Sequence, residues 1–110
     1  MSYNVRKMID LLESQVNNGG FNQFFFNSSG DQTFNVLESL KAISAMATHG
    51  IMLRAIGKFP NGVVPGDHAI RQSVLESIDP ETDAFEEQDE SFYRYEDNLS
   101  KLVADYELRG

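Results

Sequence analysis

Apolar residues recur at helical intervals along nearly the whole chain, with polar residues between them. The first stretch has the spacing of a single helix face, and its apolar members are Val5, Met8, Ile9, Leu12 and Val16. Gly19 and Gly20 follow, and glycine commonly provides the left-handed conformation that ends a helix. The pattern therefore predicts a first helix that stops near Asn17 or Asn18. Residues 21–26 form a short aromatic segment, helical or turn-like.

Two further apolar stripes occupy the middle of the chain. Residues 28–31 predict a loop whose Asp31 caps the next helix. A single central helix is predicted from Gln32 to about Ala47, and its stripe consists of Val36, Leu40, Ile43 and Ala47, with Phe34, Leu37 and Ala45 nearby. Thr48 then caps another helix, which ends at the break formed by residues 60–62. The apolar positions of this helix are Met52, Leu53, Ile56 and Phe59.

The last half of the chain predicts three more helices. Residues 63–66 form an extended connection, and Asp67 caps a helix that ends at Asp79-Pro80. The inner face of this helix is Ile70 or Arg71, followed by Val74, Leu75 and Ile78. The next helix runs from near Thr82 to Arg94, with Phe85 and Phe92 inward. A final helix follows Asp97 and has an apolar face made of Leu99, Leu102, Val103 and Tyr106.

The sequence indicates neither a β-sheet nor a repeat fold, because no strand pattern of comparable strength and no internal repeat is present. A chain of 110 residues can build one hydrophobic core but is too short for two domains of ordinary size. We therefore expect an all-α fold: one compact domain spanning residues 1–110, with about six to seven short helices.

The charge of the chain restricts the kind of partner it can bind. The formal net charge is −8 and is unevenly distributed. Residues 1–75 carry a net charge of +1, whereas residues 76–110 carry −9. Such a surface repels nucleic acids and anionic membranes and attracts basic surfaces from a distance. We therefore expect no direct contact with nucleic acid or membrane, and a basic protein as the partner.

The chain has no cysteine, which excludes disulfides, thiolate metal sites and thiol nucleophiles and fits a reducing compartment. No stretch approaches the ~20 apolar residues of a membrane span, and the first residues lack the pattern of a signal peptide. The expected location is the cytoplasm.

No motif for catalysis is visible. His49 and His68 lie far apart in the sequence, and neither has a second metal ligand at helical spacing. The serines fit no nucleophile elbow, and Gly19-Gly20 lacks the strand and the lysine of a phosphate-binding loop. Residues 79–87 alternate acids somewhat like a calcium loop but lack the glycine of its sharp turn. We predict no enzymatic activity, no cofactor and no metal.

The acidic run is the feature that bears on function. If it is helical, Asp83, Glu86, Glu87 and Glu90 lie at i, i+3, i+4 and i+7 and line one face. Neighbours on such a face are about 5–6 Å apart, close to the spacing of phosphates along a nucleic-acid strand. The run either mimics DNA or is a solvated edge of the domain. The predicted partner-binding residues are Asp79, Glu81, Asp83, Glu86, Glu87, Asp89, Glu90, Glu96 and Asp97.

Residues 18–31, Asn-Gly-Gly-Phe-Asn-Gln-Phe-Phe-Phe-Asn-Ser-Ser-Gly-Asp, resemble the signature of the DNA-mimic protein family, a group of small bacterial helical domains that mostly carry a domain-of-unknown-function label. Later residues fall in the order of that family: Phe59-Pro60, Val64-Pro65, Asp67, Arg71, Phe92-Tyr93 and Tyr106. The resemblance implies an all-helical fold. For the member that named the family, it implies a dimer whose acidic surface occupies the DNA-binding face of a transcription factor.

The signature itself predicts a core and not a site. Its aromatic residues Phe21, Phe24, Phe25 and Phe26 supply the volume that a small core needs. Its Asn and Gly residues suit tight turns at either end. Any mimicry must therefore depend on the acids of the last third of the chain.

Three functions remain open. The first is a DNA mimic that blocks a basic nucleic-acid-binding protein, marked by salt-sensitive binding. The second is an immunity-like or regulatory protein that neutralises a basic toxin or enzyme and adds an apolar anchor, such as an exposed cluster of Phe92, Tyr93 and Tyr95. The third is a structural domain that has no charge-dependent partner and is either a monomer or a homodimer.

Overall fold

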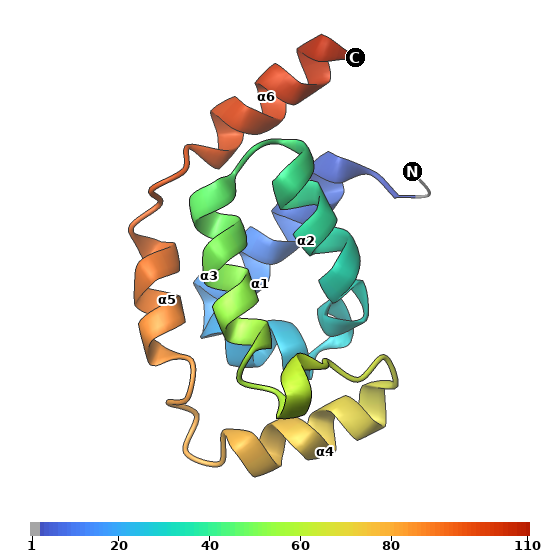
Figure 1. Ribbon diagram of the computed structural model, residues 1–110, viewed down its shortest axis with the longest axis vertical. Coiled ribbons are helices and arrows are strands. Elements are labelled where there is room, and N and C mark those ends of the chain that lie inside the picture. The colour runs from blue at the N-terminus through green and yellow to red at the C-terminus, as the bar shows by residue number, and fades with distance from the viewer. Residues whose placement is uncertain (1–2) are drawn as a thin grey trace.

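Six α-helices, joined by short connections and two 3-10 turns, make up the computed structural model, which describes residues 3–110 (Figure 1). The helices are α1 (Val5–Phe26), α2 (Thr33–Ala42), α3 (Met46–Ile56), α4 (His68–Ile78), α5 (Glu86–Tyr93) and α6 (Leu99–Arg109). The 3-10 turns are η1 (Ser28–Gln32) and η2 (Pro60–Gly62). No strand occurs among these residues, so the predicted all-α fold is confirmed. None of the helices in this range is both long and apolar enough to cross a membrane.

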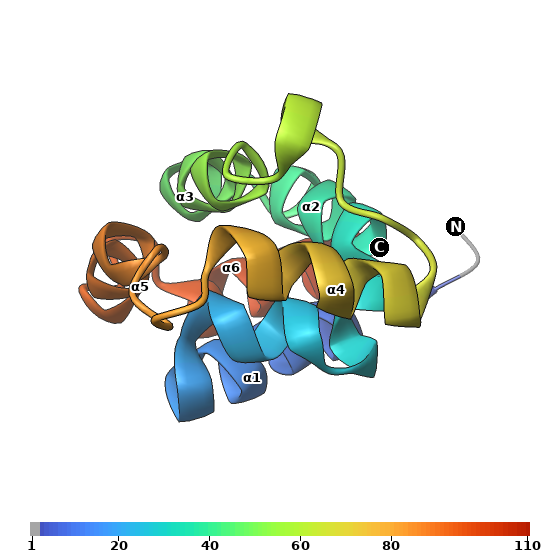
Figure 2. The same cartoon turned by 90° about the horizontal axis from the view of Figure 1, so that it is seen from below.

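The helices form a layered arrangement. Figure 2 shows α1 on one face of the molecule and α2 and α3 on the opposite face. In Figure 1, α4, α5 and α6 follow one another around the rim. Since α5 contacts both α1 and α3, it closes the edge between the two faces. The acid-rich last third of the chain therefore lies along the rim of the molecule.

The first helix is interrupted where the glycine pair predicts its end. Gly19 has φ −152° and ψ 20°, and Gly20 has φ 74° and ψ −174°, so the axis breaks there and the helix resumes at Phe21. The backbone angles of Gly20 are accessible almost only to glycine. A Cβ at this position would also lie 2.3 Å from the Asp89 Oδ2 atom. The glycine thus permits both the kink and the close approach of α5.

Aromatic rings from the signature segment form the centre of the core. The ring centroid of Phe25 lies 4.9 Å from that of Phe59, 5.6 Å from that of Phe85 and 5.4 Å from that of Phe24. These are the distances at which aromatic pairs attract beyond simple burial. Phe21, Phe24 and Phe25 are fully buried, as predicted, but the prediction for Phe26 was wrong because 41% of its surface is exposed.

The helix predicted from Gln32 to about Ala47 ends five residues early, and the helix predicted to follow Thr48 already begins at Met46. The first of the two ends at Ala42 because Ser44 adopts φ 63°, and the Ala45 N–H donates to the Leu40 carbonyl (2.9 Å) while the Ser44 N–H donates to the Lys41 carbonyl (3.0 Å). This pair of bonds is the Schellman motif, which usually has glycine at the left-handed position. Because serine occupies this position here, no signal for the end of the helix is visible in the sequence. Thr48 consequently lies inside α3 and does not cap it.

The helices α4, α5 and α6 are found where the pattern predicts them, with two differences: the inward residue near the start of α4 and the first residue of α5. Asp67 caps α4 as predicted, with its Oδ1 atom accepting a bond from the Ile70 N–H at 2.9 Å. Arg71, and not Ile70, is the inward residue. The helix expected from near Thr82 begins only at Glu86, so Asp83 lies outside it and the four-residue acidic stripe does not form on one helix.

Candidate protein-binding surface

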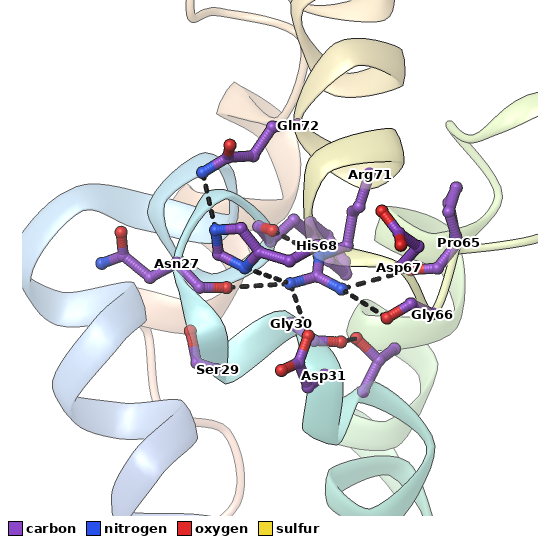
Figure 3. Close-up of polar contacts among 12 residues, drawn as sticks. Asn27, Ser29, Gly30, Asp31, Pro65, Gly66, Asp67, His68, Arg71 and Gln72 are labelled. Atoms are coloured by element: carbon purple, nitrogen blue, oxygen red, sulfur yellow. Dashed lines mark hydrogen bonds and ion pairs between the residues drawn. The ribbon is translucent and has the colours of Figure 1, made fainter.

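A fully buried arginine joins the signature segment to α4 (Figure 3). The Arg71 Nε–H donates to the Phe25 carbonyl at 2.7 Å, and Nη2 donates to the Asn27 carbonyl at 3.1 Å. These carbonyls belong to the last turn of α1, where backbone acceptors have no helical partner. The same Nη2 lies 2.9 Å from Asp31 Oδ1, so Asp31 pairs with Arg71 and the prediction that it caps α2 was wrong. A Cβ on Gly30 would lie 2.3 Å from Arg71 Nε, which explains why glycine is required there.

The rest of the guanidinium is bonded to the start of α4. Nη1 lies 3.2 Å from the Pro65 carbonyl and 3.5 Å from the Gly66 carbonyl, and Nη2 lies 3.2 Å from His68 Nδ1 (Figure 3). Guanidinium has five N–H donors, and each nitrogen of Arg71 has an acceptor. No donor is left for a ligand, so this cluster holds the fold together.

Two of the predicted partner-binding acids also bind the signature segment. Asp79 is only 3% exposed; its Oδ2 accepts a bond from Asn22 Nδ2 (2.7 Å) and its Oδ1 accepts one from the Ala84 N–H (2.8 Å). Asp89 Oδ1 accepts a bond from the Phe21 N–H at 2.8 Å, which satisfies an N–H at the restart of the helix after the kink. Burial raises the pKa of the Asp89 carboxyl, the Phe21 bond lowers it, and the charges of Asp79 and Glu86 raise it further.

A third acid of the predicted set secures α3. Asp97 Oδ2 accepts bonds from both the backbone N–H (2.7 Å) and the hydroxyl (2.8 Å) of Thr48. A carboxylate near a helix N-terminus satisfies free N–H groups and interacts favourably with the helix dipole. Asp79, Asp89 and Asp97 therefore all have a structural role in this fold.

The other six predicted acids are exposed, and we call them the acidic edge: Glu81, Asp83, Glu86, Glu87, Glu90 and Glu96. They lie on the connection before α5, on α5 itself and on the connection after it, along one side of the rim in Figure 1. Arg54 of α3 lies 3.4 Å from Glu87, with both side chains about half exposed. Such an exposed ion pair contributes little stability. The structure thus brings together six of the nine predicted residues on one exposed rim.

Comparison with known proteins identifies the family to which the chain belongs. A family model described as DMP19-like protein matches residues 5–110. The chain belongs to this DMP19-like family. No curated protein and no solved structure matches it. The matched residues run from the start of α1 to the end of the chain and so include all six helices.

The aromatic residues near α5 of this DMP19-like chain match the expected apolar anchor only in part, because Tyr93 and Tyr95 are 48% and 38% exposed whereas Phe92 is buried. Phe92 is 3% exposed and packs against Phe21, with a centroid distance of 6.0 Å. Tyr93 donates its hydroxyl to the Val16 carbonyl at 3.0 Å, and the Tyr95 hydroxyl donates to Glu13 at 2.7 Å. Burial raises the pKa of both tyrosines, so their hydroxyls stay protonated donors at neutral pH. These rings fasten α5 to α1.

One exposed apolar feature was missed by the sequence pattern. A groove of about 400 Å³ lies between α2, α3 and the connection after η2. Phe34 is 70% exposed, Val63 is 62% exposed and Leu53 is 47% exposed. The pattern associated Phe34 with the apolar stripe of one helix and Leu53 with that of the next, but both side chains are exposed. Within residues 3–110, no three His, Asp or Glu side chains are placed to hold a metal ion.

Proposed function

We propose that this DMP19-like chain binds a basic nucleic-acid-binding protein through the acidic edge and occupies the face that would otherwise contact DNA, without catalysing a reaction. One observation carries the proposal: six exposed acids lie on three consecutive segments of the rim, namely the connection before α5, α5 itself and the connection after it. The sequence contains no lysine or arginine between Arg71 and Arg94, and within residues 3–110 only Arg54 of α3 forms an ion pair with one of them, Glu87. A concentrated negative surface of this kind attracts and orients a basic partner.

Rigidity supports the proposal, because a mimic must hold its charges in place. α5 is fastened on two sides: Asp89 and Tyr93 bond to the backbone of α1, and Glu87 lies close to Arg54 of α3. Asp97 fixes the connection that follows α5. The acidic edge is thus presented on well-anchored backbone, which lowers the entropy lost on binding.

A purely structural explanation covers only part of the charge. Glu86 and Glu87 lie in the first turn of α5, where acids are favourable to the helix dipole by roughly 0.3–1 kcal/mol each. This explanation does not apply to Glu81, Asp83 or Glu96, which are outside the helix, and Glu90 lies past its first turn. The resemblance of residues 18–31 to the DNA-mimic signature points toward the binding function as well.

The test is capture of partners from a lysate of the source organism at low and high salt. The wild type is compared with a triple variant Glu86→Gln, Glu87→Gln and Glu90→Gln. We expect the wild type to retain a basic DNA-binding protein that duplex DNA displaces, and the triple variant to bind it at least about tenfold more weakly because the attraction is electrostatic.

The matched control is a second triple variant, Asp10→Asn, Glu38→Gln and Asp105→Asn, which removes the same charge outside the acidic edge. It should retain the partner nearly as well as the wild type. Equal loss in both variants would indicate a response to net charge alone. Retention of the same proteins by all three chains, or of none, would favour a structural domain with no charge-dependent partner.

A further inference from the structure

A polar cleft of about 410 Å³ lies beside the acidic edge, between the signature segment of α1 and the connection from α4 to α5. Its walls include the carboxylates of Asp79 and Asp89, the amides of Asn22 and Asn27 and the ring of Phe26. No lysine, arginine or histidine lines it among the residues that the structure describes. The cleft therefore has negative charge and no positive counter-charge.

The cleft contains several hydrogen-bond acceptors that have no donor in the described part of the chain. Asn22 Nδ2 donates one of its two N–H groups to Asp79 at 2.7 Å, and Asn27 Nδ2 donates one of its two to Gln15 at 3.0 Å. The side-chain carbonyl oxygens of both asparagines, and Asp89 Oδ2, have no hydrogen bond within residues 3–110. An anion would be repelled here, whereas a cation with several N–H donors would satisfy these oxygens.

The burial of the two carboxylates gives an independent reason to expect a cation. Asp79 is only 3% exposed, yet its hydrogen-bond donors, Asn22 and Ala84, are both neutral. Asp89 is partly buried with a neutral donor, and neither acid has an ion-pair partner in the described part of the chain. Burying a carboxylate without a counter-charge is costly, and binding a cation at this point removes the cost.

The aromatic wall favours one kind of cation. Phe26 leaves 41% of its surface exposed although its neighbours Phe24 and Phe25 are fully buried. A planar guanidinium stacks on an aromatic ring and directs its five donors to acceptors around its edge, whereas an ammonium is a compact, strongly hydrated charge. The combination of ring, carboxylates and amide oxygens matches an arginine side chain better than a lysine side chain.

We infer that this cleft receives an arginine side chain from the basic partner, with its guanidinium against Phe26 and its donors directed to Asp89 and the asparagine oxygens. The inference rests on the proposed function for the origin of the arginine. It adds a specific anchor to the diffuse attraction of the acidic edge. Basic DNA-binding proteins use arginine for phosphate contacts, so such a side chain is available on the face that a mimic would cover.

The cleft is tested without the partner by titrating ¹⁵N-labelled protein with N-acetyl-arginine amide, N-acetyl-lysine amide and the neutral isostere N-acetyl-citrulline amide. We expect saturable shifts of the amides in residues 19–27 and 79–89 with the arginine derivative, with a Kd of about 1–10 mM for a single side chain. The lysine derivative should bind more weakly and the citrulline derivative should give no saturation. Equal responses to arginine and citrulline, or shifts confined to the acidic edge, would overturn the inference.

Two variants separate the cleft from general charge. Asp89→Asn keeps an oxygen for the Phe21 N–H but removes the charge, and Phe26→Leu removes the ring. Each should weaken binding of the arginine derivative about fivefold or more, whereas Glu96→Gln, an equal charge change outside the cleft, should alter it less than twofold. Thermal melts of each variant show whether the fold is kept. Unchanged affinity in both folded cleft variants contradicts the inference.

The same variants are then used against the captured partner. Weaker capture by Asp89→Asn and Phe26→Leu supports the inference, and capture equal to the wild type overturns it even if the free derivative binds. Failure of the proposed function shows itself differently, as the absence of any partner that duplex DNA displaces.

Discussion

Arg71 shows how one residue can determine a junction of the fold. Its guanidinium bonds to the carbonyls that end α1, to the connection before α4 and to Asp31, and it is fully buried. Burial of a charge is tolerated only when pairing and hydrogen bonds replace the lost water. The α4 pattern permitted either Ile70 or Arg71 inside, and hydrophobicity alone favours the wrong one. The decisive acceptors are backbone carbonyls distant in sequence, which no pattern reveals.

Replacement of Arg71 should therefore be severely destabilising. Arg71→Met leaves several buried carbonyls without donors, and we expect a loss of about 3–5 kcal/mol in the free energy of unfolding. Arg71→Lys keeps the charge but has too few donors in the wrong geometry, so its loss should be smaller and still exceed about 1 kcal/mol. Urea unfolding followed by circular dichroism measures both.

The control for this prediction is Arg109→Met, which removes an exposed cation at the end of α6 and should change stability by less than about 0.5 kcal/mol. A stability of Arg71→Lys equal to that of the wild type would contradict the structural role given to the buried guanidinium.

The predicted surface acids divide into those that are hydrogen-bonded within the fold and those that are exposed. The predicted surface acids Asp79, Asp89 and Asp97 are bonded to the signature segment or to Thr48, while Glu81 and Glu96 are exposed. The sequence shows only that all are acidic. Which ones turn inward depends on the positions of N–H donors from α1 and α3, and these are known only once the helices are packed.

At the scale of elements, local signals predicted most boundaries correctly. The glycine pair marks the kink in α1, Asp67 caps α4, and the apolar face of α6 is found where the pattern puts it. The error lies between α2 and α3, where Ser44 takes the left-handed conformation that a glycine usually signals. α5 also starts later than expected, because the Asp79 side chain and the turn after it organise residues 79–85.

The Ser44 position gives a prediction about stability. Left-handed backbone costs a residue with a side chain about 1–2 kcal/mol, and glycine avoids most of that cost. Because Ser44 is exposed and no hydrogen bond to its side chain is present in the described chain, Ser44→Gly should stabilise the protein by about 0.5–1 kcal/mol.

The matched substitution is Ser73→Gly, an exposed position within α4, where glycine should instead destabilise by about 0.5–1 kcal/mol. Thermal unfolding of the two variants beside the wild type gives the comparison. Destabilisation by Ser44→Gly would show that the end of α2 is not held in the conformation described.

At the scale of the whole molecule, the fold determines where the negative charge lies on the surface. The net −9 of residues 76–110 was readable from the sequence, but its placement was not. The fold places α4, α5 and α6 around the rim, so the backbone segments that carry the acidic edge, a helix and the connections at both its ends, follow one another there (Figure 1). The exposed acids therefore lie near one another in the fold although they do not form the single helical stripe that the sequence predicted. The polar cleft lies next to these segments, since Asp79, Thr82 and Asp89 line it.

The measurement that tests this account most directly is competition between this protein and duplex DNA for the captured partner. Fluorescence anisotropy of labelled duplex bound to the partner is followed as the DMP19-like protein is added, at two salt concentrations. Mimicry predicts complete release of the DNA, weaker at high salt and nearly absent for the Glu86→Gln, Glu87→Gln and Glu90→Gln variant. A stable complex containing partner, DNA and this protein together would contradict it.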